Sequence, residues 1–205
     1  KTKMSASITE RRNIWMRWRV RLGYPVGIAF WLLASPTAHS MIHGVILAAL
    51  GLMTRAYAAG YLVKYRQLAT TGPYAHTRNP LYFGSALLAA GFAVAGHSWA
   101  AATIIILYFA AVYYAVMRNE ESDLRARHGS VFDLYASQVP LFLPRIWRVK
   151  TSARTDPSAA APKFTWAQYR RNREYQALIG TILGFAVVWI RIYAPAWLLM
   201  LSRHR

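Results

Sequence analysis

The feature that most constrains this chain is the length of its uncharged stretches. Residues 22–54 contain no formally charged side chain, and neither do residues 79–117. A helix that crosses a bilayer needs about 20 mostly apolar residues, so each stretch is long enough for two crossings. A third uncharged stretch, 175–190, is followed by Arg191 and then by residues 192–202, which are again uncharged. This last segment predicts one more crossing.

Turn signals divide each long stretch into a helical hairpin. Ser35-Pro36-Thr37 interrupts the first stretch and Gly96-His97-Ser98 the second. Arg191 and Pro195 lie within the last segment, where they could divide it into a short crossing and an interfacial piece. We therefore expect an all-α integral membrane protein with about five transmembrane helices, at residues 22–37, 40–63, 80–96, 98–117 and 175–199.

The net charge fits two classes of protein, and the positions of the charged residues along the chain distinguish between them. The chain carries 25 Lys and Arg against 7 Asp and Glu, a net charge of +18, which fits a nucleic-acid binder or a membrane protein. Most basic residues fall in 1–21, 64–78 and 118–173, beside the predicted crossings, and no nucleic-acid-binding motif accompanies them. We expect membrane lipids and no nucleic acid as partners. The N-terminus and the long loops are predicted to be cytoplasmic, at the inner membrane if the protein is bacterial.

Several kinds of site are excluded by residue types and motifs. The chain has no cysteine, which excludes disulfides, thiolate metal sites and a cysteine nucleophile. His39 and His43 are four residues apart, but no carboxylate lies near them in the sequence. We interpret them as interfacial residues and expect no metal site. The motif G-x-G-x-x-G does not occur, so any nucleotide-like cofactor must be held by membrane helices and their loops.

The start of the third predicted helix is one candidate site. Gly72-Pro73 forms a turn, Asn79 is a suitable N-cap and Pro80 suits the first helical position. The unpaired amides and positive dipole end of such a helix can hold the carboxylate of an amino-acid-like cofactor, with Tyr74 and Tyr82 beside it. A capped helix with interfacial tyrosines explains the same residues equally well.

A cluster of acids is the second candidate site. Glu120, Glu121 and Asp123 are three of the chain's seven acids, and we expect them at the end of the fourth helix. Carboxylates at a helix C-terminus meet the unfavourable end of the dipole, so arginines or a bound cation should compensate them. The candidate arginines are Arg78, Arg125 and Arg127. The residues that follow have the spacing of an amphipathic helix lying in the membrane interface: Leu124, His128, Phe132 and Tyr135.

The order of these motifs resembles that of the isoprenylcysteine carboxyl methyltransferase family, which is related to membrane phospholipid methyltransferases. The matching motifs are Gly72-Pro73-Tyr74, the Arg-Asn-Pro-Leu-Tyr-Phe-Gly of residues 78–84, Glu120-Glu121 and Val139-Pro140. The resemblance covers about residues 50–147. It implies that S-adenosylmethionine is bound by the membrane helices and loops themselves, with the interfacial helix completing the cofactor site.

The resemblance also implies site residues. It places cofactor contacts at Arg66, Gln67, Leu68, Ala69, Tyr74, Asn79, Pro80, Leu81, Tyr82 and Glu120. Two positions depart from the family pattern, because Asn79 replaces the usual His and Val116 stands where the family has a substrate-binding Arg. Arg118 is the nearest replacement for that Arg. We expect Arg118 or Arg55 to orient an acidic group on the acceptor, and Glu120 or Glu121 to act as the base if the acceptor is an amine.

These expectations define a function and a domain organisation. The predicted protein is a membrane methyltransferase that uses S-adenosylmethionine and a lipophilic or lipidated acceptor, first of all an isoprenylcysteine-like carboxylate. The alternatives are a phospholipid N-methyltransferase, an NADPH-dependent sterol reductase-like protein and a non-enzymatic membrane scaffold. The predicted divisions are an N-terminal segment with the first span, the methyltransferase core, a cytoplasmic linker and a C-terminal helix, at 1–49, 50–147, 148–174 and 175–205. The pairs Gly23/Gly27 and Gly180/Gly184 are expected to pack helices within or between chains, which leaves a homodimer open.

Overall fold

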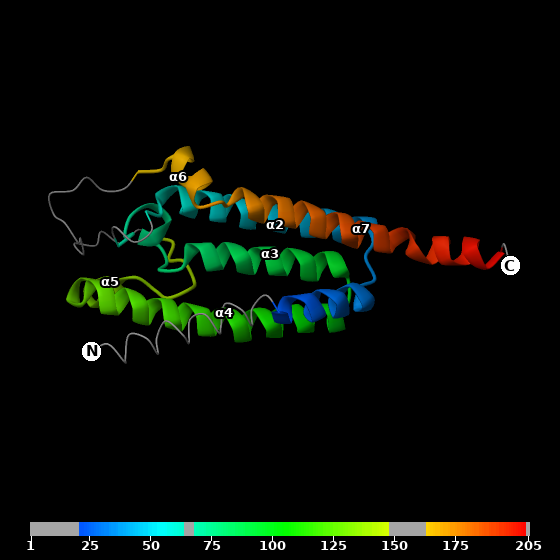
Figure 1. Cartoon of the computed structure of the whole chain (residues 1–205), viewed down its shortest axis with the longest axis horizontal. Helices are drawn as coiled ribbons and strands as arrows, with labels where there is room; N and C mark the ends of the chain where they lie inside the picture. Colours follow the sequence, from blue (N-terminus) through cyan, green and yellow to red (C-terminus); the bar gives the residue numbers. More distant parts are fainter. Residues whose placement is uncertain (1–20, 64–67, 148–162, 204–205) are drawn as a thin grey trace.

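A computed structural model describes residues 21–63, 68–147 and 163–203, with side chains described as far as Tyr193. These residues form helices and contain no strand, so the all-α prediction is confirmed. Helices α2, α3, α4 and α7 run side by side along one axis, and the first helix lies against part of α4 (Figure 1). The helices are Arg21–Leu33, α2 Ala38–Tyr61, the 3-10 turn η1 Gly72–Ala75, α3 Pro80–Gly96, α4 Trp99–His128, α5 Ser130–Gln138, α6 Trp166–Arg171 and α7 Tyr175–Arg203.

Three of the described helices are long and apolar enough to cross a membrane: α2, α4 and the Tyr175–Tyr193 part of α7. Arg21–Leu33 and α3 are apolar but shorter. Five apolar helices therefore occupy the predicted places, while length and composition support three of them as full crossings. The last helix continues through Arg191 and Pro195 without a break.

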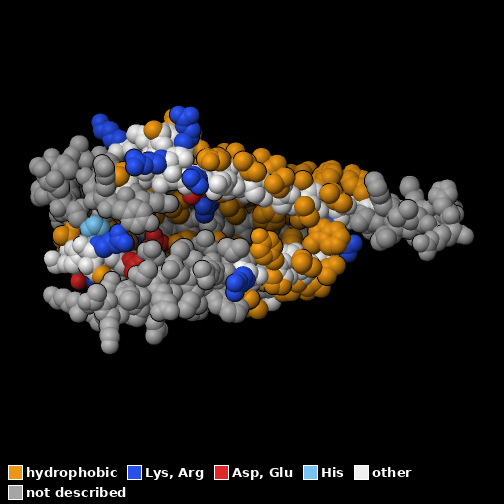
Figure 2. Space-filling view, in the orientation of Figure 1, with side chains coloured by type: hydrophobic (Ala, Val, Ile, Leu, Met, Phe, Trp, Pro, Cys, Tyr) orange, Lys and Arg blue, Asp and Glu red, His pale blue; other side chains and the backbone are white. Residues whose placement is uncertain are grey.

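One end of the bundle gathers the loops and short helices. This loop end consists of residues 68–79, α5, residues 139–147 and α6 (Figure 1). On the face drawn in Figure 2, the acidic side chains and most of the basic ones lie toward this end, and the bundle beyond it is mainly apolar. On this face, the charged side chains are therefore gathered mainly at the loop end.

The opposite end is closed by the two hairpin turns, which bond to each other. Thr37 caps α2 in a reciprocal pair with Ser40, in which each side-chain oxygen accepts from the other residue's amide. The amide of Ser35 donates to the carbonyl of Gly96 at 2.8 Å, and Oγ of Ser40 donates to the carbonyl of Ala95 at 3.0 Å. Because buried backbone groups need partners, these bonds fix the α2 and α3 ends together.

Glycines allow α2 and α3 to approach closely along their length. A Cβ built on Gly44 would lie 2.5 Å from the carbonyl oxygen of Gly91, and one built on Gly51 would lie 2.7 Å from that of Gly84. The same conflict arises from the other side, where a Cβ on Gly91 would meet the Gly44 carbonyl oxygen at 2.7 Å. The helices pack antiparallel, backbone against backbone, as small residues permit in membrane proteins.

The predicted glycine pairs have a smaller part in this packing. In each of the two G-x-x-x-G pairs, one glycine meets a neighbour and the other faces open space. A Cβ on Gly184 would lie 2.7 Å from the ring of Phe92 and one on Gly23 would lie 3.3 Å from the Tyr108 hydroxyl, whereas Gly27 and Gly180 have nothing within 4 Å. The closely packed glycines are those spaced seven apart on α2 and α3, which the four-residue motif did not reveal.

Two predictions about the acidic region are wrong. α4 does not end near Met117 but continues to His128, because the residues after Met117 contain no helix breaker and include good helix formers. Glu120 and Glu121 therefore lie inside a helix, not at its C-terminus. The expected interfacial helix is also interrupted, at Gly129 with φ of +53°, and Phe132 and Tyr135 of α5 are buried within the loop end.

The glycine packing predicts a contrast between two Gly→Ala changes. Gly51→Ala should lower the free energy of unfolding by about 1–3 kcal/mol, because its Cβ conflicts with backbone atoms that cannot move independently. Gly180→Ala should be neutral or stabilise by up to about 1 kcal/mol, since Ala favours helix and the space is open. The measurement is reversible unfolding of the purified protein in mixed detergent micelles. Equal stability of the two variants would contradict the packing described for α2 and α3.

Candidate functional site

Charged side chains from α2, from α4 and from the segments directly before α3 and α7 form two ion pairs near the loop end. Arg55 of α2 forms one ion pair with Glu174, three residues after α6 and directly before α7. Arg78, just before α3, forms a second ion pair with Glu121 of α4. These two pairs join segments that are far apart in sequence, and the tyrosines described below lie among their charges.

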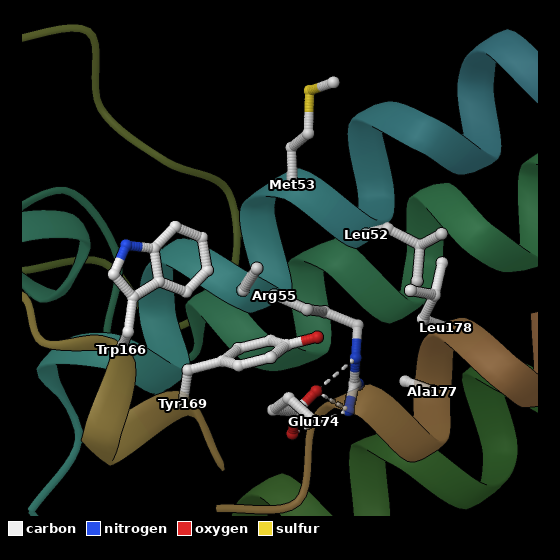
Figure 3. A pocket seen from close by; sticks show the side chains of 9 residues that line it. Leu52, Met53, Arg55, Trp166, Tyr169, Glu174, Ala177 and Leu178 are labelled. Atoms are coloured by element: carbon white, nitrogen blue, oxygen red, sulfur yellow. Dashed lines mark hydrogen bonds and ion pairs between the residues drawn. The ribbon is translucent and has the colours of Figure 1, made fainter.

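Arg55 is bound completely by groups of the chain itself. Its Nε and Nη2 donate to the carboxylate of Glu174 at 2.7–3.0 Å, and its Nη1 donates to Oγ of Ser85 at 2.5 Å and to the carbonyl of Leu81 at 3.4 Å. The Arg55 and Glu174 side chains are only 19% and 11% exposed. Every guanidinium nitrogen is thus engaged, in the forked geometry that suits a carboxylate (Figure 3).

Glu121 is the buried acid of the α4 cluster. Its carboxylate pairs with Arg78 and also accepts from Nη1 of Arg118 at 3.1 Å. Its side chain is 9% exposed, whereas that of Arg118 is 60% exposed. The prediction that Arg78 compensates this cluster is confirmed. Arg125 instead pairs with Asp133 of α5 at 2.7 Å.

Glu120 faces a different partner from its neighbour. Its Oε2 accepts a hydrogen bond of 2.8 Å from the hydroxyl of Tyr82 on α3. The Tyr82 ring in turn meets the ring of Tyr113 edge to face, with centroids 5.6 Å apart. Glu120 and Tyr82, which the sequence placed in one cofactor site, are therefore in direct contact across the α3–α4 interface.

Tyr74 of η1 carries a buried hydroxyl without a hydrogen-bond partner among the described residues. Burial raises the pKa of Tyr74, and the charges of Glu120 and Glu174 raise it further. Burial also raises the pKa of Tyr135, whose hydroxyl donates to the carbonyl of Tyr74 at 2.8 Å. The Tyr74 hydroxyl therefore stays protonated at neutral pH and offers a buried donor.

Asn79 stands at the N-cap position, but its side chain does not cap the helix. Its Nδ2 donates to the carbonyl of Leu141 at 2.9 Å, and Oγ1 of Thr77 donates to the carbonyl of Phe142 at 2.9 Å. The predicted side-chain cap is therefore wrong, because the amide group serves the contact between two loops. Pro80 occupies the first helical position, as predicted.

The remaining predicted cofactor residues are placed as follows. Leu68 is buried with Phe132, Tyr135 and Val139 at the loop end, and Ala69 is partly buried beside it. The carbonyl of Leu81 receives the long bond from Arg55. Arg66 and Gln67 lie outside the described residues.

Sequence reasoning missed Glu174 and the segment that carries it. The side-chain amides of Gln168 and Asn172 donate to the carbonyl of Leu62, and Asn172 also donates to that of Ala59 at 2.8 Å. The segment therefore satisfies carbonyls at the C-terminal end of α2, which an isolated helix leaves unpaired. One signal was available: Glu174 is the single acid in residues 163–174, where four basic residues precede it just before the last apolar stretch.

The comparisons with known proteins identify the family. The phospholipid methyltransferase family model matches residues 27–130, just over half of the chain, and the chain belongs to this family. Together with the apolar helices, this family indicates an integral membrane protein. The match includes both the 78–84 motif and the glutamate pair. It begins before the predicted region and ends before Val139-Pro140.

Two curated proteins share part of the sequence. The chain is 37% identical over 118 residues to the nickel-cobalt-cadmium resistance protein NccN of Alcaligenes xylosoxydans xylosoxydans, covering 57% of this chain and 53% of that protein. It is 36% identical over 105 residues to the cobalt-zinc-cadmium resistance protein CzcN of Cupriavidus metallidurans, covering 50% and 47%. The chain thus spans about half the length of these relatives. No solved structure matches it.

Removing the charge of Glu121 should destabilise the fold strongly. Glu121→Gln keeps the shape of the side chain but leaves the buried Arg78 without its counter-charge, so we expect a loss of about 3–5 kcal/mol. Asp133→Asn is the matched control, since its pair with Arg125 is more than half exposed on both sides and should contribute little to stability. Unfolding in detergent measures both. Similar losses for the two variants would refute the distinct role of the buried pair.

The buried tyrosines predict loss of stability in alkali. The pKa of Tyr74 is higher in the folded protein than its ordinary value of 10.0, so this hydroxyl ionises more readily in the unfolded chain. Its contribution is therefore fully present below about pH 10 and is lost as the pH rises further. Tyr74→Phe should reduce the fall of the unfolding temperature above about pH 10. Ionisation of Tyr135 should account for part of the fall that remains in this variant. Tyr114→Phe, at a site 60% exposed, should leave the decline unchanged.

Proposed function

We propose that this protein is a membrane methyltransferase that transfers a methyl group from S-adenosylmethionine to a lipophilic acceptor. The observation that carries the proposal is the contact between Tyr82 and Glu120 beside the unpartnered hydroxyl of Tyr74. The three residues come from the two motifs and the turn on which the family resemblance was recognised. The cofactor would lie at the loop end, between η1, the start of α3 and α4.

The chemistry of these groups fits the cofactor. The Glu120 carboxylate can accept hydrogen bonds from ribose hydroxyls or from an ammonium group, and Tyr74 offers a buried donor. Glu120 acts on the Tyr74 hydroxyl, and its negative charge suits a sulfonium cation. The rings of Tyr82 and Tyr113 provide an aromatic surface against which a base can pack.

The protein's part in the reaction is mainly alignment. S-adenosylmethionine supplies an already activated methyl group. The residues of the chain have to hold the acceptor in line with it and exclude water. Two guanidinium groups engage Glu121, so its carboxylate fixes Arg78 and Arg118 in place. Glu120 is then the better placed carboxylate to remove a proton from an amine acceptor, whereas a carboxylate acceptor would need no base.

The acceptor is the less determined part of the proposal. An isoprenylcysteine-like carboxylate needs a cation to orient it, and Arg118, more than half exposed, is the candidate on α4. Arg55 is occupied by Glu174 and Ser85. The family description favours a phospholipid head-group amine as the competing acceptor. Incubation with methyl-labelled cofactor and membranes, followed by lipid extraction, separates the two, because a methyl ester is labile to base and an N-methyl group is not.

Cofactor binding is the direct test. Calorimetry of the full chain in lipid nanodiscs should detect S-adenosylmethionine, and Glu120→Gln and Tyr82→Phe should each weaken its binding about tenfold or more, through loss of a hydrogen bond that involves a charge. Asp133→Asn, an exposed acid on α5, is the matched control and should bind normally. A folded sample that binds no S-adenosylmethionine would overturn the proposal. A parallel titration with NADPH tests the alternative of a sterol reductase-like protein. A titration with Co²⁺ tests whether the protein binds a metal ion, as the names of the metal-resistance relatives suggest.

A further inference from the structure

The outer side of the Arg55–Glu174 pair forms the end of a pocket between α2, α6 and α7. The pocket has a volume of about 220 Å³. Its walls are mostly apolar or aromatic, and its polar groups are the ion pair and Tyr169, whose hydroxyl end points toward Arg55 (Figure 3). The other lining residues are Leu52, Met53, Ala56, Trp166, Ala177 and Leu178.

The rim of the pocket lies on the outer surface of the bundle. Met53 on α2 and Trp166 on α6 are each 66% exposed, and Leu178 on α7 is 41% exposed. Both α2 and the first part of α7 are long and apolar enough to cross a membrane. The pocket therefore opens where acyl chains of the bilayer would contact the protein, and its occupant should carry an apolar chain.

The polar end of the pocket limits what kind of head group can bind. All nitrogens of Arg55 already donate to Glu174, Ser85 or Leu81. On Glu174, Oε2 accepts two of these bonds and Oε1 accepts one. A carboxylate oxygen can accept two hydrogen bonds, so Oε1 keeps one position for a donor. The ion pair has no net charge and offers an acceptor, but no unused guanidinium donor.

We propose that this pocket binds a single-chain amphiphile from the bilayer whose head group donates a hydrogen bond, a hydroxyl or an ammonium, and that Glu174 excludes anionic amphiphiles. A carboxylate head would face the Glu174 carboxylate without a guanidinium to receive it. A hydroxyl or ammonium would complete the open position on Oε1. The proposal concerns binding alone and goes beyond methyl transfer, for which the proposed cofactor site is around Tyr74 and Glu120.

The test compares head groups on the unaltered full chain. It uses photoactivatable alkyl probes of equal chain length that end in an amine, an alcohol or a carboxylate, in phosphatidylcholine nanodiscs, whose choline heads have no N–H. Labelled residues are mapped by mass spectrometry, and affinities are obtained by competition with unlabelled alkyl compounds. The amine and the alcohol should label α2 and α7 at the pocket and bind about tenfold more tightly than the carboxylate.

Two matched variants test the location and the role of Glu174. Ala177→Phe fills the pocket and should abolish labelling there, while Ile182→Phe, an exposed position on the same helix that does not line the pocket, should not. Glu174→Gln removes the like charge and leaves Arg55 uncompensated, so it should raise affinity for the carboxylate about tenfold and lower that for the amine.

Two results would overturn the proposal. One is equal or tighter binding of the carboxylate by the unaltered protein, and the other is undiminished labelling of Ala177→Phe. If Glu174→Gln fails to fold, these two measurements still decide whether the pocket binds such an amphiphile. Titration of the same nanodiscs with S-adenosylmethionine shows separately whether the proposed enzymatic function holds, because neither result depends on cofactor binding.

Discussion

The close contact between α2 and α3 is the constraint on which the rest of the described structure depends. Gly44 meets Gly91 and Gly51 meets Gly84, so the two backbones approach without side chains between them. Gly84 has a second consequence, because a Cβ there would lie 2.6 Å from Cγ of Arg55. The missing methyl group is what lets the Arg55 side chain pass α3 and reach Ser85 and the carbonyl of Leu81.

The α2–α3 contact in turn sets the positions of the charged side chains. Arg55, once fixed on α3, holds Glu174 and thereby the start of α7. Directly before α3, Arg78 holds Glu121 of α4. Buried ion pairs contribute little net stability compared with apolar packing, but loss of one partner is costly. These two pairs therefore act mainly as positional constraints. The Tyr74 hydroxyl, which has no hydrogen-bond partner among the described residues, is acted on by the charges of Glu120 and Glu174.

Much of the fold could be predicted because its signals are local. Apolar stretches and turn residues predicted where five helices begin, and the 78–84 motif with Glu120-Glu121 identified the family that the comparison confirmed. Two errors have different causes. Asn79 was expected to cap its own helix but bonds to Leu141, a contact between segments far apart in the sequence. α4 was expected to end near Met117 but continues to His128, because no helix breaker stands between them.

The sequence by itself determined that the chain is helical and that it belongs in a membrane, and it predicted that Tyr82 and Glu120 lie together, as their hydrogen bond shows. Each of these rests on hydropathy, turn chemistry or motif order, which are properties of neighbouring residues. Only the tertiary structure decided that Arg55 is neutralised by Glu174, 119 residues away, and that glycines spaced seven apart join α2 to α3. The physical reason is that such pairings depend on which helix faces meet, and this is fixed by close packing between segments, not by the pattern within any one of them.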